Sequence, residues 1–311
     1  WRAVSTYIEK VGKVLENIAQ LQKLDRAAYQ AIVEQVKNHG ALEAIWQEPY
    51  PEYASRGLKV ATLLNATGEQ ENFDYRDCRN VKSTPLLNEL STIKTFFAGS
   101  GLDIMGARLL RLDAGTFLHE HRDFIYLEPV PRFRLHLPLI TNPDCFIVSP
   151  DINVHFKAGY LWKLDPKSTI HSACNFGKEP RIHLMLDCYV NQTLAELIEK
   201  QFLDEDAKFV KPALTKSIKE DLQEQAINLL KQSPDNLTAA EEIILAAFCR
   251  YNLYSLKEGL TTYDILSQVY EQATRAIPTL AALLKERQAY WQARLVETYP
   301  ERKEKEAALA V

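Results

Sequence analysis

The pattern of apolar and polar residues changes its period near residue 190. Between residues 102 and 190, apolar and polar residues alternate as in β-strands, and turn sequences such as Asp113-Ala-Gly115 and Asn142-Pro-Asp144 interrupt the alternation at short intervals. From residue 192 onward, apolar residues recur every three or four positions, as they do on helices. We therefore expect a β-rich domain over residues 1–190 and an all-helical domain over residues 191–311.

The first hundred residues predict helices around a single strand. Residues 1–40 show helical periodicity that ends near Asn38-His39-Gly40, and this helix is a candidate cover for the outer face of a sheet. A strand is expected over residues 59–64, a candidate mobile lid over residues 67–77 and a helix over residues 84–97. The apolar stripe of the first helix consists of Val11, Val14, Leu15, Ile18 and Leu21.

The C-terminal part predicts about five amphipathic helices and carries no constellation of metal ligands or nucleophiles. It could close one mouth of a barrel, form a homodimer interface or receive a larger substrate, and the sequence does not choose among these roles. The helices are expected at residues 195–203, 218–231, 239–254, 262–276 and 278–296.

The short strands, regular turns and central histidines favour an α+β fold whose core is a double-stranded β-helix, the jelly-roll architecture of the cupins. A length of 311 residues, with 46% hydrophobic and 25% charged residues, is typical of an ordinary globular protein of about two domains. No apolar run is long enough to span a membrane, and a net charge of −4 gives no reason to expect nucleic acid. Five cysteines without a C-x-x-C spacing favour a reducing compartment, so we expect a cytoplasmic protein.

Six of the seven histidines lie between His119 and His183, and they indicate a metal centre. Alternate residues of a strand point to one face, so His121 and Asp123 can reach one ion together, with His171 as a third ligand. Two imidazoles and one carboxylate leave part of the metal open, which suits non-haem Fe(II), whereas a structural zinc site would need four ligands. His119 is an alternative ligand, or else it lies beside the site.

Two expected strands carry cationic and imidazole side chains on one face and apolar side chains on the other. Arg132, Arg134 and His136 share one face of residues 132–138, and Arg181 shares a face of residues 181–189 with His183. The polar faces predict an anion-binding interior. A turn near residues 176–177 would form a hairpin with Arg181 opposite or diagonal to His171.

Six sequence blocks, in this order and spacing, carry a resemblance to a known family. The chain resembles the aspartyl/asparaginyl β-hydroxylases, a family of Fe(II)/2-oxoglutarate oxygenases, and within that family it is most similar to the bacterial L-proline cis-4-hydroxylase type. The blocks are residues 108–115, His119-Glu-His-Arg-Asp123, Arg134-Leu-His-Leu-Pro138, Ala158-Gly-Tyr-Leu-Trp162, Ile170-His171-Ser172 and residues 181–187.

The resemblance implies a set of cofactors and the residues that hold them. It implies Fe(II), 2-oxoglutarate and O₂, with His121, Asp123 and His171 as the iron ligands. Arg181 would pair with the far carboxylate of 2-oxoglutarate. Arg134 and His136 would face either the iron-proximal carboxylate of the co-substrate or the carboxylate of the substrate.

The roles of four further residues stay open at this stage. His183 contacts the co-substrate or is a buried histidine bonded to a neighbour. Arg122 and Arg132 bind the substrate or are solvated. Trp162 lines the substrate pocket or belongs to the core.

The function expected from these features is hydroxylation of an unactivated C–H bond of an amino acid, free or within a small peptide or carrier-bound intermediate, with release of succinate and CO₂. One alternative is a cupin-like metal enzyme that does not use 2-oxoglutarate and would not need Arg181. The other is a non-catalytic sensor or scaffold on the same fold, which would be expected to have lost a metal ligand.

Overall fold

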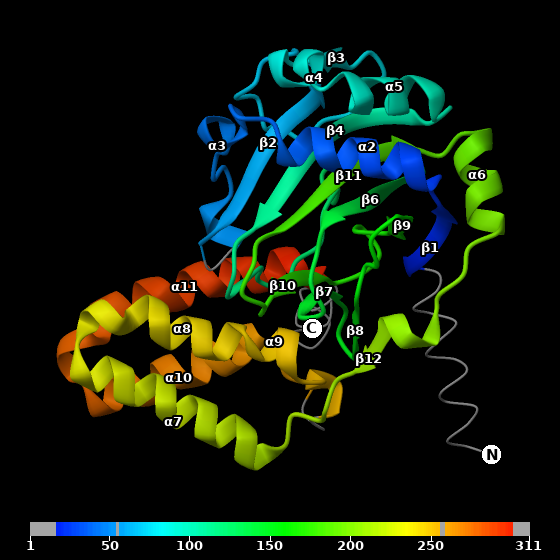
Figure 1. The fold of residues 1–311 in the computed structure, drawn as a ribbon. Coiled ribbons are helices and arrows are strands. Elements are labelled where there is room, and N and C mark those ends of the chain that lie inside the picture. Colours follow the sequence, from blue (N-terminus) through cyan, green and yellow to red (C-terminus); the bar gives the residue numbers. More distant parts are fainter. Residues whose placement is uncertain (1–16, 54–55, 256–258, 301–311) are drawn as a thin grey trace, which may run out of the picture.

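Two antiparallel sheets form the core of the protein (Figure 1). The structure is a computed structural model that describes residues 17–53, 56–255 and 259–300. The larger sheet contains, in spatial order, β1 (Ile18–Lys23), β9 (Tyr160–Leu164), β6 (Arg132–Ile140), β11 (Arg181–Tyr189), β4 (Asp103–Leu112), β2 (Leu58–Asn65) and β3 (Lys82–Ser83). The smaller sheet contains β12 (Lys208–Val210), β8 (Ile152–Val154), β7 (Cys145–Val148), β10 (Ser172–Asn175) and β5 (Thr116–Phe117).

Helices flank these sheets on both sides, so the predicted α+β jelly-roll architecture is confirmed (Figure 1). Among the described residues, no helix combines the length and the apolar character needed to cross a bilayer. The N-terminal helices are α2 (Arg26–Lys37), α3 (Leu42–Ile45), α4 (Pro85–Glu89) and α5 (Ser91–Gly99). The C-terminal helices are α6 (Gln192–Glu199), α7 (Lys216–Gln232), α8 (Leu237–Leu245), α9 (Ala247–Arg250), α10 (Thr262–Ala276) and α11 (Ala281–Thr298). Short 3-10 turns occupy Pro51–Tyr53, Glu205–Ala207, Pro234–Asn236, Leu253–Ser255 and Pro278–Leu280.

The outer face of the larger sheet is apolar, as the alternation along β6 and β11 predicts. Leu184 and Leu186 of β11 lie in one hydrophobic cluster with Leu135 and Leu137 of β6, and α2 adds the buried face that includes Ile32. All of these side chains are at most 1% exposed. Burying each of these side chains stabilises the fold by on the order of 1.5–3 kcal/mol. Because successive side chains of a strand point to opposite faces, the residues between them in β6 and β11 face the smaller sheet.

The N-terminal helix predicted over residues 1–40 is correct for α2, which ends beside Asn38 and covers the outer face of the sheet, but it is wrong for residues 18–23. Ile18 and Leu21 belong to β1, which pairs with β9 in antiparallel register, and α2 starts only at Arg26. Ile18–Leu21 are four consecutive buried residues, and such a short run fits a buried strand as well as a helix. Val11, Val14 and Leu15 lie outside the described residues.

Two further expectations need correction. The helix predicted over residues 84–97 is two helices, α4 and α5, because Leu90 leaves the helical region at φ −94° and ψ 67°. Residues 176–180 do not close a hairpin, since β10 pairs with β5 and β7 whereas β11 pairs with β4 and β6. The segment crosses from one sheet to the other, and a five-residue connection is compatible with either path.

The C-terminal helices pack on the outer face of the smaller sheet. One hydrophobic cluster joins Phe117, Val148 and Cys174 of that sheet with residues of α7 to α11, among them Phe248 and Trp291. The five expected helices are present, but the third segment is split into α8 and α9. The division into domains at residue 190 stays a prediction.

Candidate metal centre

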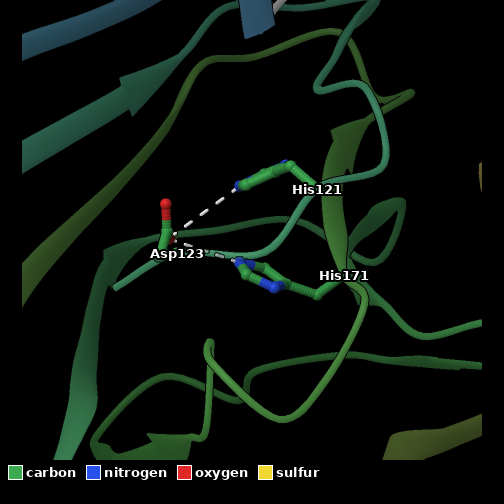
Figure 2. Close-up of side chains that lie close together, drawn as sticks. All are labelled: His121, Asp123 and His171. Carbon is green, nitrogen blue, oxygen red and sulfur yellow. Dashed lines mark ion pairs between the residues drawn. The ribbon is translucent and has the colours of Figure 1, made fainter. Parts of the chain in front are cut away.

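His121, Asp123 and His171 place their ligand atoms within 4.8 Å of one another, and no other such group of three occurs among the described residues. His121 and His171 form an isolated antiparallel bridge, in which each backbone nitrogen donates to the other residue's carbonyl oxygen at N···O distances of 3.0 and 2.9 Å. This bridge brings the two imidazole rings to a centroid distance of 4.4 Å. In Figure 2 both rings point toward the Asp123 carboxylate, whose Oδ2 lies 3.9 Å from Nε2 of His121 and 3.6 Å from Nε2 of His171.

The hydrogen bonds of the two histidines leave the metal-facing nitrogens available. Nδ1 of His121 donates to the carbonyl oxygen of His119 at 2.7 Å, and Nδ1 of His171 donates to that of Thr169 at 3.0 Å. A carbonyl only accepts, so Nδ1 carries the proton and Nε2 keeps its lone pair in the neutral ring. Burial, assisted by the charge of His171, lowers the pKa of His121 to about 4, which favours this neutral form.

Asp123 is held as a carboxylate. Burial alone would raise its pKa, but the charge of Arg134 and the neighbouring histidines outweigh it and hold the pKa well below the ordinary value. The backbone N–H of Asp123 donates to the carbonyl of Pro166 at 2.8 Å. The next residue, Phe124, has a φ of 61°, a left-handed conformation that costs a bulky side chain on the order of 1–2 kcal/mol.

His119 does not join the ligand set. Its Nδ1 donates to the carbonyl of Glu52 at 3.2 Å, and its ring lies edge-on to Trp291 at 5.2 Å. The neighbouring Glu120 is 1% exposed and points toward the helical region. Its carboxylate accepts from the hydroxyls of Thr262 at 2.5 Å and Tyr299 at 2.8 Å.

Arg134 connects the candidate metal ligand Asp123 to the buried carboxylate of Asp187. Its Nε donates to Asp187 at 2.8 Å, and its Nη1 forms an ion pair with Asp123. In this geometry the guanidinium fixes the orientation of a ligand carboxylate. Its predicted contact with a carboxylate of the co-substrate or substrate stays a prediction.

Arg181, His136 and His183 form a buried polar cluster between the sheets. They are 2%, 3% and 1% exposed, and Nε and Nη1 of Arg181 and all four ring nitrogens of the histidines find no hydrogen-bond partner among the described residues. The two imidazoles lie 5.5 Å apart, and burial, followed by the nearby arginines, lowers the pKa of each well below its usual range. Because a buried, unpaired guanidinium costs several kcal/mol, this cluster fits a bound anion.

The three expected substrate residues lie in different surroundings. Arg122 lines a cavity beside the metal ligands. Arg132 pairs with Asp77 at 2.5 Å. Trp162 is completely buried, stacks on Phe156 at 4.4 Å, and donates from Nε1 to the carbonyl of Lys157. Arg132 and Trp162 are not among the residues that line the cavity.

The cavity beside the metal ligands has a volume of about 310 Å³ and is largely aromatic and aliphatic. His121, Asp123 and Arg134 form one wall of it. The aromatic residues of this cavity and the acidic residue Glu297 carry no recognisable sequence motif, because they come from loops and from one helix. The residues that the sequence alone did not indicate include Tyr50, Tyr53, Tyr75, Phe124, Tyr126 and Glu297.

The fold and this site define a jelly-roll protein with three side chains that could hold one metal ion. A family model described as aspartyl/asparaginyl β-hydroxylase matches residues 26–190, more than half of the chain. The chain belongs to the aspartyl/asparaginyl β-hydroxylase family. This membership confirms the predicted class of enzyme, a hydroxylase among the Fe(II)/2-oxoglutarate oxygenases.

Two characterised relatives are proline hydroxylases. The chain is 29% identical to L-proline cis-3-hydroxylase 1 of a Streptomyces species over 229 residues, which cover 70% of this chain and 74% of that protein. It is 34% identical to L-proline cis-4-hydroxylase of Rhizobium meliloti strain 1021 over 152 residues, or 46% of this chain. That second alignment spans about half of the relative, 52% of its length.

Solved structures give weaker similarities. A prolyl-4-hydroxylase from Pseudomonas putida has 17% identity and a TM-score of 0.34, covering 58% of this chain and 98% of that one. A 2-oxoglutarate-Fe(II) oxygenase from Burkholderia pseudomallei has 12% identity and a TM-score of 0.32, covering 54% and 93%. At these TM-scores the two are neighbours only, and the family membership rests on the sequence match.

Proposed function

We propose that the protein hydroxylates an unactivated C–H bond of a small free amino acid, with L-proline as the first substrate to test because both relatives above are named for acting on it. The observation that carries the proposal is the unpaired, buried Arg181 at the start of β11, in the interior between the two sheets. A metal enzyme that did not bind an anionic co-substrate would gain nothing from that uncompensated charge.

The described residues suit the cofactors that the family implies. His121, Asp123 and His171 would hold Fe(II), and Arg181 would hold the far carboxylate of 2-oxoglutarate through its planar fork. When bound, Fe(II), 2-oxoglutarate and O₂ supply an oxidation in which 2-oxoglutarate becomes succinate and CO₂ and one oxygen atom enters the substrate. His136 and His183, unpaired beside Arg181, would donate hydrogen bonds to the same co-substrate.

The other side chains orient the reactants and exclude water. Arg134 holds the Asp123 carboxylate in place through an ion pair to Oδ2. The aromatic and aliphatic walls of the cavity, including Tyr75 and Phe124, would surround the carbon skeleton of the substrate and keep water away. Arg122 is the cationic candidate for the carboxylate of the substrate, whereas the cavity lining offers no support for Arg132 or Trp162 in that role.

The proposal also covers the form of the substrate, the oligomeric state and the cellular location. A residue within a peptide or a carrier-bound intermediate is the main variant of the substrate. A homodimer through the C-terminal helices and a cytoplasmic location, the latter suggested by the spacing of the five cysteines, remain proposals too.

The test is an anaerobic titration of the apo protein with Fe(II) and then 2-oxoglutarate, which follows the visible charge-transfer band of the chelate. We expect a band that His171→Ala abolishes and that needs far more co-substrate in Arg181→Ala. The standard amino acids are then screened for stimulation of succinate release. A missing band would favour a cupin-like enzyme of another chemistry or a non-catalytic scaffold, and a band without stimulation would favour a peptide or carrier-bound substrate.

A further inference from the structure

The C-terminal helix α11 reaches the cavity beside the metal ligands. Among the described residues that line this cavity, Glu297 is the contribution of the C-terminal helices, and it shares the cavity with His121, Asp123 and Arg134. In Figure 1, α11 runs below the lower ends of β2 and β4. A charged side chain from the helical region therefore faces the reaction space of the β-rich part.

The carboxylate of Glu297 is held in place but can accept another donor. Its Oε2 accepts from Nη1 of Arg294 at 2.6 Å. Its Oε1 accepts from the hydroxyls of Tyr53 and Tyr126, each at the long distance of 3.3 Å. Two neutral donors at that distance are weak partners for a carboxylate oxygen, and a charged donor would form a shorter and stronger bond.

The carboxylate lies close to the metal site. The ring of Tyr53, whose hydroxyl contacts Glu297, packs against the ring of His121 at a centroid distance of 5.4 Å. One tyrosine side chain thus separates the carboxylate from a metal ligand. Glu297 and His121 line the same cavity, so a ligand bound there can contact both sides of it.

The position of Glu297 on its helix also favours a cationic ligand. Glu297 lies in the last turn of α11, an 18-residue helix. The exposed carbonyl groups of a helix C-terminus carry partial negative charge, so an acidic side chain there is electrostatically unfavourable for the helix, whereas a bound cation is favoured. Arg294, three residues earlier on the helix, pairs with Glu297 and offsets part of this cost. A cationic group in the cavity would gain from both the carboxylate and the helix end.

We infer that Glu297 binds the ammonium group of the amino-acid substrate and makes α11 part of the specificity pocket. The inference rests on the proposed function. An amino acid carries one cationic and one anionic group, and the cavity lining offers the carboxylate of Glu297 and the guanidinium of Arg122 for them. The apolar carbon skeleton would lie between, against the aromatic wall.

The test compares two ligands that differ at one atom. L-proline carries the ring ammonium, and (S)-tetrahydrofuran-2-carboxylate replaces it with an uncharged ether oxygen. Binding of each is measured by calorimetry without O₂ on full-length protein loaded with Mn(II) and 2-oxoglutarate. For Glu297→Gln we expect L-proline to bind about 10- to 100-fold more weakly, the range of one hydrogen bond to a charged group, and the ether analogue to change little.

Glu52→Gln is the matched control, because Glu52 is the other glutamate that lines the cavity, and its backbone hydrogen bond to His119 is unchanged by the substitution. If Glu297→Gln weakens both ligands equally, Glu297 shapes the pocket through Tyr53 and Arg294, and the inference is refuted. An effect of Glu52→Gln larger than that of Glu297→Gln also refutes it. Binding of 2-oxoglutarate without binding of any standard amino acid refutes the inference and favours the peptide or carrier-bound variant of the substrate, whereas failure of 2-oxoglutarate to bind refutes the proposed oxygenase chemistry itself.

Discussion

Replacement of Arg181 by leucine should change stability and co-substrate binding in opposite directions. The guanidinium is 2% exposed, and its Nε and Nη1 have no hydrogen-bond partner among the described residues. Burial lowers the pKa of Arg181, with Cys145 and Cys174 offsetting part of the shift. The arginine therefore costs the apo protein free energy of folding, and a leucine side chain would occupy part of the same space without a charge.

The expected magnitudes follow from this environment. Replacing a buried ion pair by apolar side chains is often neutral or stabilising by roughly 1–4 kcal/mol, and a buried charge without a partner should cost the folded protein at least as much. For a chain of this size each kcal/mol corresponds to about 2–4 °C, so the melting temperature of apo Arg181→Leu should rise by several degrees. Removing one partner of a buried charged pair costs about 3–5 kcal/mol, so binding of 2-oxoglutarate should weaken by about two to four orders of magnitude.

Thermal unfolding of the apo protein and anaerobic titration with 2-oxoglutarate measure the two effects separately. Arg181→Lys keeps the charge but loses the planar fork, and it should fall between the wild type and Arg181→Leu in co-substrate affinity. Arg275→Leu, at an exposed position of α10, controls for the loss of a positive charge. A destabilised apo Arg181→Leu, or one that binds 2-oxoglutarate within a few-fold of the wild type, would show that Arg181 is a structural residue with a partner in solution.

Three further predictions concern the metal centre and its supports. His171→Ala should lose bound Fe(II) on dialysis, measured by elemental analysis, whereas retention of one equivalent would place the metal elsewhere. Tyr299→Phe should lower the free energy of unfolding by about 1–3 kcal/mol, measured in urea, because buried Glu120 loses a donor at 2.8 Å; an unchanged midpoint would contradict this. Burial lowers the pKa of His119 to about 4, so the folded protein binds fewer protons than the unfolded chain between about pH 6.5 and 4. Stability should therefore be full above pH 6.5 and fall by up to about 3 kcal/mol as the pH drops to 4, and His119→Gln should flatten this dependence.

The sequence predicts those strands whose two faces have different surroundings. β11 begins and ends at the predicted residues Arg181 and Tyr189, because its apolar residues meet the outer helices while its polar residues face the interior. The sequence of β1 also fits a helix, because a short run of buried residues does not show its secondary structure. The strand is set by pairing with β9, which only the folded chain brings beside it. The crossing between β10 and β11 was mistaken for a hairpin, since local turn chemistry does not show which sheet receives the next strand.

The chemistry of the site was predictable where one strand or a recognised motif fixes it. The grouping of His121, Asp123 and His171 agrees with the spacing argument and with the family resemblance. The partner of Arg134 was not predictable, because Asp187 is 53 positions away and faces it only through the register of β6 and β11. Glu297 was missed for the same reason, since no local pattern on α11 indicates the cavity at its end.

These long-range contacts also give the helical region a role that the sequence left open. The segment from His119 to His121 is supported on the helical side, where Thr262 and Tyr299 bond to the carboxylate of Glu120 and Tyr263 donates to its backbone carbonyl at 2.5 Å. Asp123 is held by an ion pair with Arg134 of β6. The relative position of the metal ligands therefore depends on two elements that meet only in the folded chain. Since α11 also supplies Glu297 to the cavity, the helical region is placed to set both the geometry of the ligands and the selection of the substrate.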